Sequence, residues 1–127
     1  MKNSNMILNK SREFIENNYF RDITAPDVAK YINVSYSYLR NLYQKEYGIS
    51  INKAINKRRV EEAKTLIEKG FPIDKIAKDI GFRNIQYFDS VFKTFEGISP
   101  TKYKNGLENK KDHVFIVNMP DLYSFKK

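Results

Sequence analysis

The chain has 127 residues, and 23 lysines and arginines against 15 aspartates and glutamates give it a formal net charge of +8. Its length is typical of one domain, and its 41% hydrophobic content supports a packed core. No apolar run approaches the roughly 20 residues of a membrane span, and no secretory signal opens the chain. The absence of cysteine excludes disulfides and thiolate chemistry, and a single histidine is too few for a histidine metal site. We expect a basic, soluble, cytoplasmic domain whose charge favours a phosphate-bearing partner.

The first fifty residues predict three helices. Polar and apolar residues alternate at helical spacing in an opening helix, whose inward positions are Ile7, Ser11, Phe14, Ile15 and Tyr19. A second helix is expected after Thr24, a favourable N-cap, with Pro26 in its first turn. A tight turn at residues 33–34 precedes a third helix, which Ser35 caps and Gly48 ends.

A long helix is predicted next, because an apolar stripe runs over residues 51–69 and ends at Gly70 and Pro72. The positive charge is densest in this helix, at Lys53, Lys57, Arg58, Arg59 and Lys64. Charge alone favours a solvated helix face, with Glu61 and Glu62 as partners, over a phosphate-binding face.

The second half of the chain repeats the first. Residues 28–29 correspond to residues 76–77 at an offset of 48, and residues 48–50 correspond to residues 97–99 at an offset of 49. Each copy is therefore predicted to fold as helix, tight turn and helix, with the second turn at residues 81–82. Inward-facing positions of the last of these helices are expected at Tyr87, Phe88, Val91, Phe92 and Phe95. In total we predict an all-α fold of seven helices.

Two helices joined by a tight turn are a common way to place side chains in the major groove of DNA. Helical bundles contain such corners too, so one copy alone does not favour DNA binding. Two matching copies in a basic chain do favour it. A connecting helix of about 28 Å, at 1.5 Å per residue, is comparable to the roughly 34 Å between successive major-groove faces.

Several strings resemble the DNA-binding domain of the AraC/XylS family of bacterial transcription regulators. They are RVEEAKTLI (59–67), IAKDIGF (76–82), YF (87–88), VFK (91–93) and GISP (97–100), followed by Tyr103. The resemblance covers residues 7–105. It implies a first helix-turn-helix subdomain at 7–50, a linker helix at 51–70 and a second subdomain at 71–105. It also implies a regulator of promoters in the bacterial nucleoid, usually an activator that contacts RNA polymerase.

The resemblance assigns base contacts to the second helix of each unit. These positions are Tyr36, Ser37, Arg40 and Asn41 in the first unit, and Asn84, Ile85, Gln86 and Ser90 in the second. Arg40 has the chemistry to bind guanine O6 and N7, Gln86 to bind adenine, and Ile85 to contact a thymine methyl group. For each polar position the alternative is a solvated residue on an exposed face, and it is strongest for the two serines and Asn84.

Contacts to the DNA backbone are expected from lysines, one arginine and the starts of two helices. These positions are Lys45, Ser50, Arg58, Lys93, Ser99 and Lys102. Arg59 either faces DNA or braces the two halves. Asp89-Ser90 departs from the family pattern of a small residue followed by arginine, and an acid there predicts weaker DNA reading by the second unit. Ala54 replaces an aromatic residue that is frequent in the family.

Residues 106–127 lie beyond the resemblance. We expect a short final helix from Pro100 through Tyr103, broken at Asn105-Gly106. Residues 114–117 have the composition of a strand. Both a partly ordered tail and a segment that docks on a partner are open interpretations of this region.

An enzyme is disfavoured, because the chain lacks a Ser/His/Asp set, a glycine-rich phosphate loop and a zinc motif. No cofactor, metal or small-molecule site is evident. The alternative to DNA reading is a helical protein-interaction module, or an anti-regulator that keeps the fold without reading DNA. The salt dependence of binding distinguishes these two functions, because the affinity of a protein for DNA falls by about 0.9 log units per phosphate contact for each log unit of salt concentration. The chain is either a stand-alone regulator or a piece of a larger one.

Overall fold

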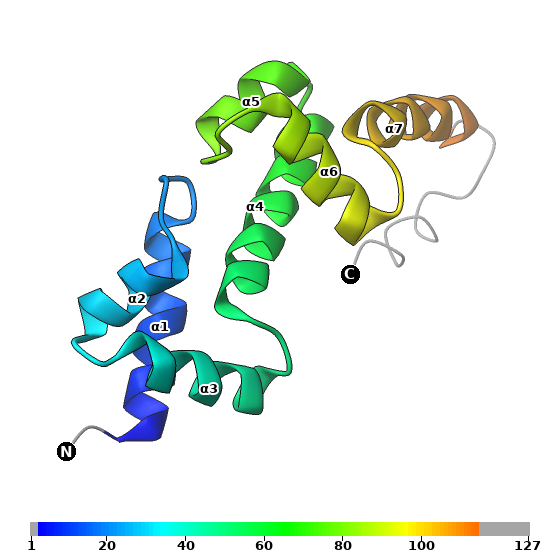
Figure 1. The fold of residues 1–127 in the computed structure, drawn as a ribbon. Coiled ribbons are helices and arrows are strands. Elements are labelled where there is room, and N and C mark those ends of the chain that lie inside the picture. The colour runs from blue at the N-terminus through cyan, green and yellow to red at the C-terminus, as the bar shows by residue number, and fades with distance from the viewer. Residues whose placement is uncertain (1–2, 115–127) are drawn as a thin grey trace.

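The computed structural model describes residues 3–114, with side chains described through residue 108. This part of the chain forms seven α-helices and no strand, which confirms the all-α prediction. They are α1 (Ser4–Asn18), α2 (Ala25–Ile32), α3 (Tyr36–Tyr47), α4 (Ile51–Glu68), α5 (Ile73–Asp79), α6 (Ile85–Glu96) and α7 (Pro100–Val114). Figure 1 shows α1–α3, here called the first unit, and α5–α7, the second unit, at opposite ends of α4.

The buried apolar residues form two separate clusters that share only α4. Ile51 and Ile55, in the first half of α4, are buried with residues of α1–α3. Val60, Ala63 and Ile67, in its second half, are buried with residues of α5 and α6. Each half of α4 therefore belongs to a different core, and the helix carries both units on one continuous backbone.

Different backbone devices form the two tight turns. In the first unit Asn33 ends α2 in the left-handed conformation, with φ of 66°, and Ser35 caps α3 by accepting a hydrogen bond from the Tyr38 N–H at 3.1 Å. In the second unit Gly81 has φ of 98°, and the side-chain oxygen of Asn84 caps α6. A side-chain cap thus fixes the start of both α3 and α6.

The prediction that the last helix ends near Tyr103 is wrong. Helix α7 continues through Gly106 to Val114, so Val114 is helical, while residues 115–117 of the expected strand lie outside the described residues. Tyr103 and Leu107 are partly buried and pack against the core of the second unit. This contact offsets the roughly 1 kcal/mol that a glycine costs inside a helix.

The prediction that Tyr87 faces inward is also wrong, since 47% of its surface is exposed. Phe88, Val91 and Phe92 are buried as expected, and Phe95 packs at the edge of the same core. Tyr87 precedes Phe88 by one position, which turns it about 100° around the helix. Its ring instead meets the edge of Phe82, with ring centroids 5.8 Å apart.

Candidate nucleic-acid interface

Helix α3 exposes most of the residues expected to contact bases. Ser37, Arg40 and Asn41 are exposed, and Tyr36 is half-buried at the start of the helix. The Arg40 guanidinium lies 5.6 Å from the centroid of the Tyr36 ring, a cation–π arrangement across one helical turn. No ion pair to Arg40 is found among the described residues. Its N–H donors are therefore available to an acceptor on a bound partner, while the guanidinium packs on the Tyr36 ring.

Helix α6 likewise exposes Asn84, Ile85, Gln86 and Ser90. The Oδ1 atom of Asn84 accepts a hydrogen bond from the Tyr87 N–H at 2.8 Å, so this oxygen is used to cap the helix and its amide N–H groups remain. Ile85 presents apolar surface to solvent at the first turn. Asp89 is exposed next to Ser90, and the expected weakening of DNA reading by this acid stays a prediction.

The expected backbone contacts fall into two groups. Lys45, Lys93 and Lys102 are exposed. Ser50 and Ser99 cap α4 and α7, because their hydroxyl oxygens accept hydrogen bonds from the N–H groups of Lys53 at 3.1 Å and Lys102 at 3.2 Å. The remaining N–H groups of these first turns have no partner within their helices and suit an anion such as phosphate.

Arg58, the sixth expected backbone contact, has partners within the protein. Its Nε and Nη2 atoms donate to both carboxylate oxygens of Glu16, at 2.8 and 3.1 Å. Glu62 lies 3.6 Å away, and the guanidinium is stacked 4.3 Å from the centroid of the Tyr19 ring. A phosphate contact by Arg58 would have to replace this bidentate pair, which favours a role in holding α1 against α4.

The pair between Glu16 and Arg58 predicts a pH effect. The hydrogen bond from Arg58 lowers the pKa of Glu16 below its ordinary value. The pair therefore stabilises the fold at any pH above the pKa that Glu16 has in the unfolded chain. This stabilisation is lost as the pH falls through the lower pKa of Glu16 in the folded chain. Because Glu16 is largely exposed, we expect Glu16→Gln to cost only about 0.5 kcal/mol at neutral pH. Thermal melts should show this difference shrinking once the pH falls below the ordinary pKa of a glutamate and vanishing in stronger acid. A difference that persisted in acid would contradict the assignment.

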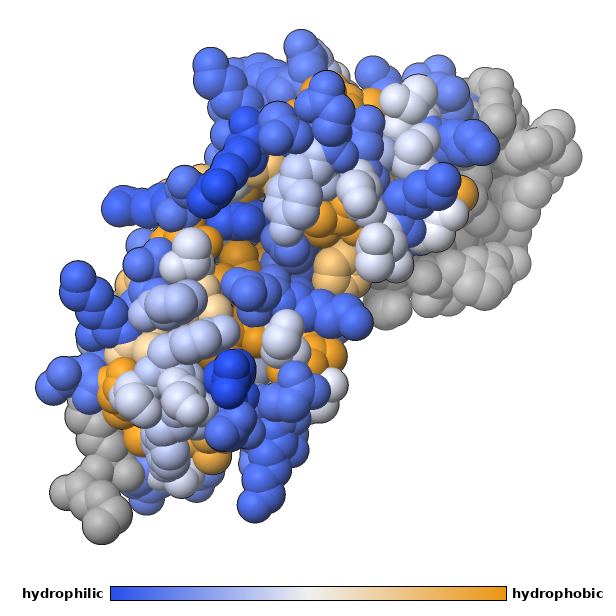
Figure 2. Space-filling model, in the orientation of Figure 1, coloured by the Kyte–Doolittle hydropathy of each residue, from blue (hydrophilic) through white to orange (hydrophobic). Residues whose placement is uncertain are grey.

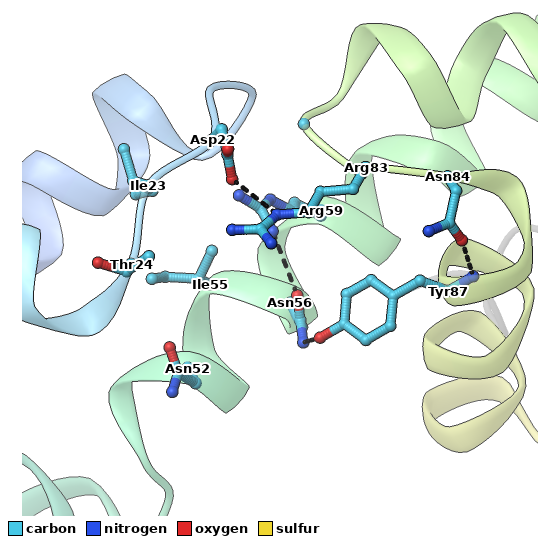
Figure 3. A pocket seen from close by; sticks show the side chains of 11 residues that line it. Asp22, Ile23, Thr24, Asn52, Ile55, Asn56, Arg59, Arg83, Asn84 and Tyr87 are labelled. Carbon is cyan, nitrogen blue, oxygen red and sulfur yellow. Dashed lines mark hydrogen bonds and ion pairs between the residues drawn. The ribbon is translucent and has the colours of Figure 1, made fainter.

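A cleft of about 470 Å³ separates the two units (Figure 3). The loop between α1 and α2 lines one side and α4 forms the floor. The turn between α5 and α6, with the first turn of α6, lines the other side. Two exposed contacts lie along it. The Arg83 and Asp22 side chains are 3.5 Å apart, and the Asn56 Nδ2 atom donates to the Tyr87 hydroxyl at 3.1 Å.

Arg59 is buried at the base of this cleft and binds the first unit. Its Nε donates to the carbonyl oxygen of Tyr19 at 2.6 Å, and its Nη2 to that of Arg21 at 2.7 Å. Its Nη1 donates to Asn56 Oδ1 at 3.4 Å. The ring of Phe82 in the second unit lies 5.4 Å from the same guanidinium, so Arg59 contacts both units and, of the two alternatives, is placed as a brace. Asn56 and Arg83 could not be identified from the sequence, because their partners Tyr87 and Asp22 lie in distant parts of the chain.

Known proteins share this pattern of two helix-turn-helix units on one linker helix. A family model described as a helix-turn-helix domain matches residues 28–106, which include both turns and all of α4. The chain belongs to the AraC family of helix-turn-helix regulators. This AraC-type chain is 36% identical over 108 residues to an HTH-type transcriptional regulator in the cgkA 5′ region of Pseudoalteromonas carrageenovora. The match covers 82% of this chain and 62% of that regulator, so the chain spans less than two thirds of its length.

Solved structures agree with this AraC-type fold. The C-terminal domain of AraT, a response regulator from Geobacillus stearothermophilus, superposes with a TM-score of 0.76 at 33% identity, covering 79% of this chain and 84% of that one. The DNA-binding domain of the global transcriptional factor AdpA, solved with a target DNA, has a TM-score of 0.75 at 18% identity and covers 84% of this chain and 96% of its own. The second likeness establishes the fold alone.

Neither a membrane-spanning helix nor a metal-binding group is found in the described residues. None of the described helices is long and apolar enough to cross a membrane. Across the same residues, no group of three or more His, Cys, Asp or Glu side chains is placed to hold a metal ion. Figure 2 shows a mainly hydrophilic face, with apolar side chains in small, separate areas.

Proposed function

We propose that this chain is a sequence-specific DNA-binding regulator of transcription that inserts α3 and α6 into adjacent major-groove segments beside a bacterial promoter. The observation that carries the proposal is the pairing of two capped helices, each with one exposed and mainly polar side, on the single rod of α4. An 18-residue rod is about 27 Å long at 1.5 Å per residue, comparable to the roughly 34 Å turn of a duplex.

The charge of the chain supports this function. The formal net charge is +8, and exposed Arg40, Lys45, Lys93 and Lys102 lie on or beside the helices that we propose to face DNA. Small, separate apolar areas on the face in Figure 2 offer little to a large hydrophobic partner. We therefore expect the affinity for duplex DNA to fall by several log units per log unit of salt. Salt-insensitive binding of a protein partner in place of DNA would instead support the helical interaction module.

Base reading is assigned first to Arg40 and Gln86, and backbone binding first to Lys93. On a duplex selected from a random library, Arg40→Ala should cost about 1–3 kcal/mol of binding free energy and relax the preference at one base pair. The measurement is fluorescence anisotropy on the selected duplex and on its single-base variants.

Lys93→Ala serves as the matched control for Arg40→Ala. It should weaken binding to every duplex alike and lower the salt slope by about one, because a lysine on a phosphate carries no sequence information. An unchanged base profile for Arg40→Ala would contradict the assignment of Arg40, and a sequence-selective loss for Lys93→Ala would contradict that of Lys93.

We extend the proposal to activation through contact with RNA polymerase, as the family resemblance implies. The test is in-vitro transcription from a promoter that carries the selected site upstream. We expect more transcript when the protein is added. A decrease in transcript would show that the chain represses that promoter.

A further inference from the structure

Arg59 is the one buried charged side chain among residues 3–108, with 6% of its surface exposed. Burial lowers the pKa of this guanidinium, which remains protonated at any physiological pH. A buried charge is retained where hydrogen bonds compensate its desolvation. Here the compensation comes from the carbonyl oxygens of Tyr19 and Arg21, which lie about 40 residues away in the loop after α1.

The second unit packs against the same two carbonyl oxygens through Gly81. A Cβ atom at Gly81 would lie 2.8 Å from the oxygen of Tyr19, 3.0 Å from that of Arg21 and 3.1 Å from Arg59 Nε. The ring of the next residue, Phe82, has its centroid 5.4 Å from the Arg59 guanidinium. These four residues and Arg59 form what we call the inter-unit junction. Within this junction, Gly81 lies three residues before Asn84, the cap of α6.

No shared apolar core holds the two units together, because their buried clusters are separate. The exposed pair of Arg83 and Asp22 is solvated on both sides and contributes little. The bond between Asn56 and Tyr87 is exposed as well. The position of α6 relative to α3 therefore depends on the α4 rod and on the buried inter-unit junction.

We propose that Arg59 is a positioning residue that fixes the number of base pairs between the two DNA blocks that α3 and α6 bind. This inference rests on the proposed DNA-binding function. One inserted base pair rotates the second block by about 36° and shifts it by about 3.4 Å. Two units held as one rigid body cannot follow that change, so the second unit loses its contacts. Two loosely joined units adapt to it.

The test compares binding to three duplexes that carry the selected blocks at their selected spacing, with one base pair added and with one removed. For the unaltered chain we expect each change of spacing to weaken binding by about 100-fold, the loss of one arm of a bivalent contact. For Arg59→Gln we expect weaker binding at the selected spacing and a spacing penalty below about tenfold. A purely structural role of Arg59 would lower all three affinities equally.

Arg58→Gln is the matched control. Among the described residues, the neighbouring arginine pairs with Glu16 and Glu62 and stacks on the ring of Tyr19. None of these contacts reaches the second unit or uses the carbonyl oxygens that Arg59 binds. Arg58→Gln should keep the full spacing penalty. If Arg59→Gln does not fold, Arg59→Lys replaces it in the same experiment, because lysine keeps the charge with a single donor group. Its spacing penalty should fall between that of the unaltered chain and the value expected for Arg59→Gln. A folded Arg59 variant with an undiminished penalty would overturn the inference. An unaltered chain without a penalty would overturn it too, whereas an unaltered chain without salt-dependent DNA binding would overturn the proposed function itself.

Discussion

Gly81→Ala should lower the free energy of unfolding by about 3 kcal/mol. A φ of 98° is unfavourable for any residue with a Cβ atom, at about 1–2 kcal/mol. The added Cβ atom would also press on the carbonyl oxygens of Tyr19 and Arg21, which are backbone atoms and can yield only by moving the first unit. Those oxygens accept the hydrogen bonds of Arg59, and each bond to a charged group is worth about 1.5–3 kcal/mol. Urea denaturation measures the loss.

Gly70→Ala is the control for Gly81→Ala. Gly70 has a similar φ of 92°, but a Cβ atom there would meet nothing within 4 Å. Only the backbone strain remains, so the loss should be about 1 kcal/mol. Equal losses for the two variants would show that the close approach at the inter-unit junction contributes nothing to stability.

Phe88→Ala should destabilise the second unit by about 3–5 kcal/mol. Phe88 is fully buried, with ring centroids 5.1 Å from Phe82 and 5.8 Å from Phe92. Its removal leaves a cavity under α6, so binding to the second DNA block should fail while the first block is still bound. The measurement combines urea denaturation with binding to each block separately.

Phe20→Ala provides the comparison for Phe88→Ala. Phe20 is 43% exposed and belongs to neither core. Its replacement should change the free energy of unfolding by only about 0.5 kcal/mol. A loss below about 1 kcal/mol for Phe88→Ala would contradict the placement of this ring at the centre of the second core.

The sequence predicted the features that depend on near neighbours. The turn at residues 33–34, the cap at Ser35 and the end of α3 at Gly48 arise within a few residues, where local chemistry decides the backbone. The burial of Phe88 and Phe92 follows from helical spacing alone. The expected base-contacting residues came from the family resemblance instead, and all of them except the half-buried Tyr36 are exposed.

Features that depend on distant partners could not be predicted in the same way. Arg58 and Arg59 are adjacent and chemically identical, yet one pairs with Glu16 and the other is buried against two carbonyl oxygens. Nothing local distinguishes them, since each partner lies about 40 residues earlier in the chain. Helix α7 passes through Gly106 for a comparable reason, because Leu107 packs on a core formed by other helices.

The central claim is that both units read DNA as one body. Selection of the full chain on a library of random duplexes at physiological salt, followed by sequencing, tests it most directly. The account predicts two enriched blocks about one helical turn apart, at a single spacing. A single enriched block, two blocks at variable spacing, or no enrichment would contradict it.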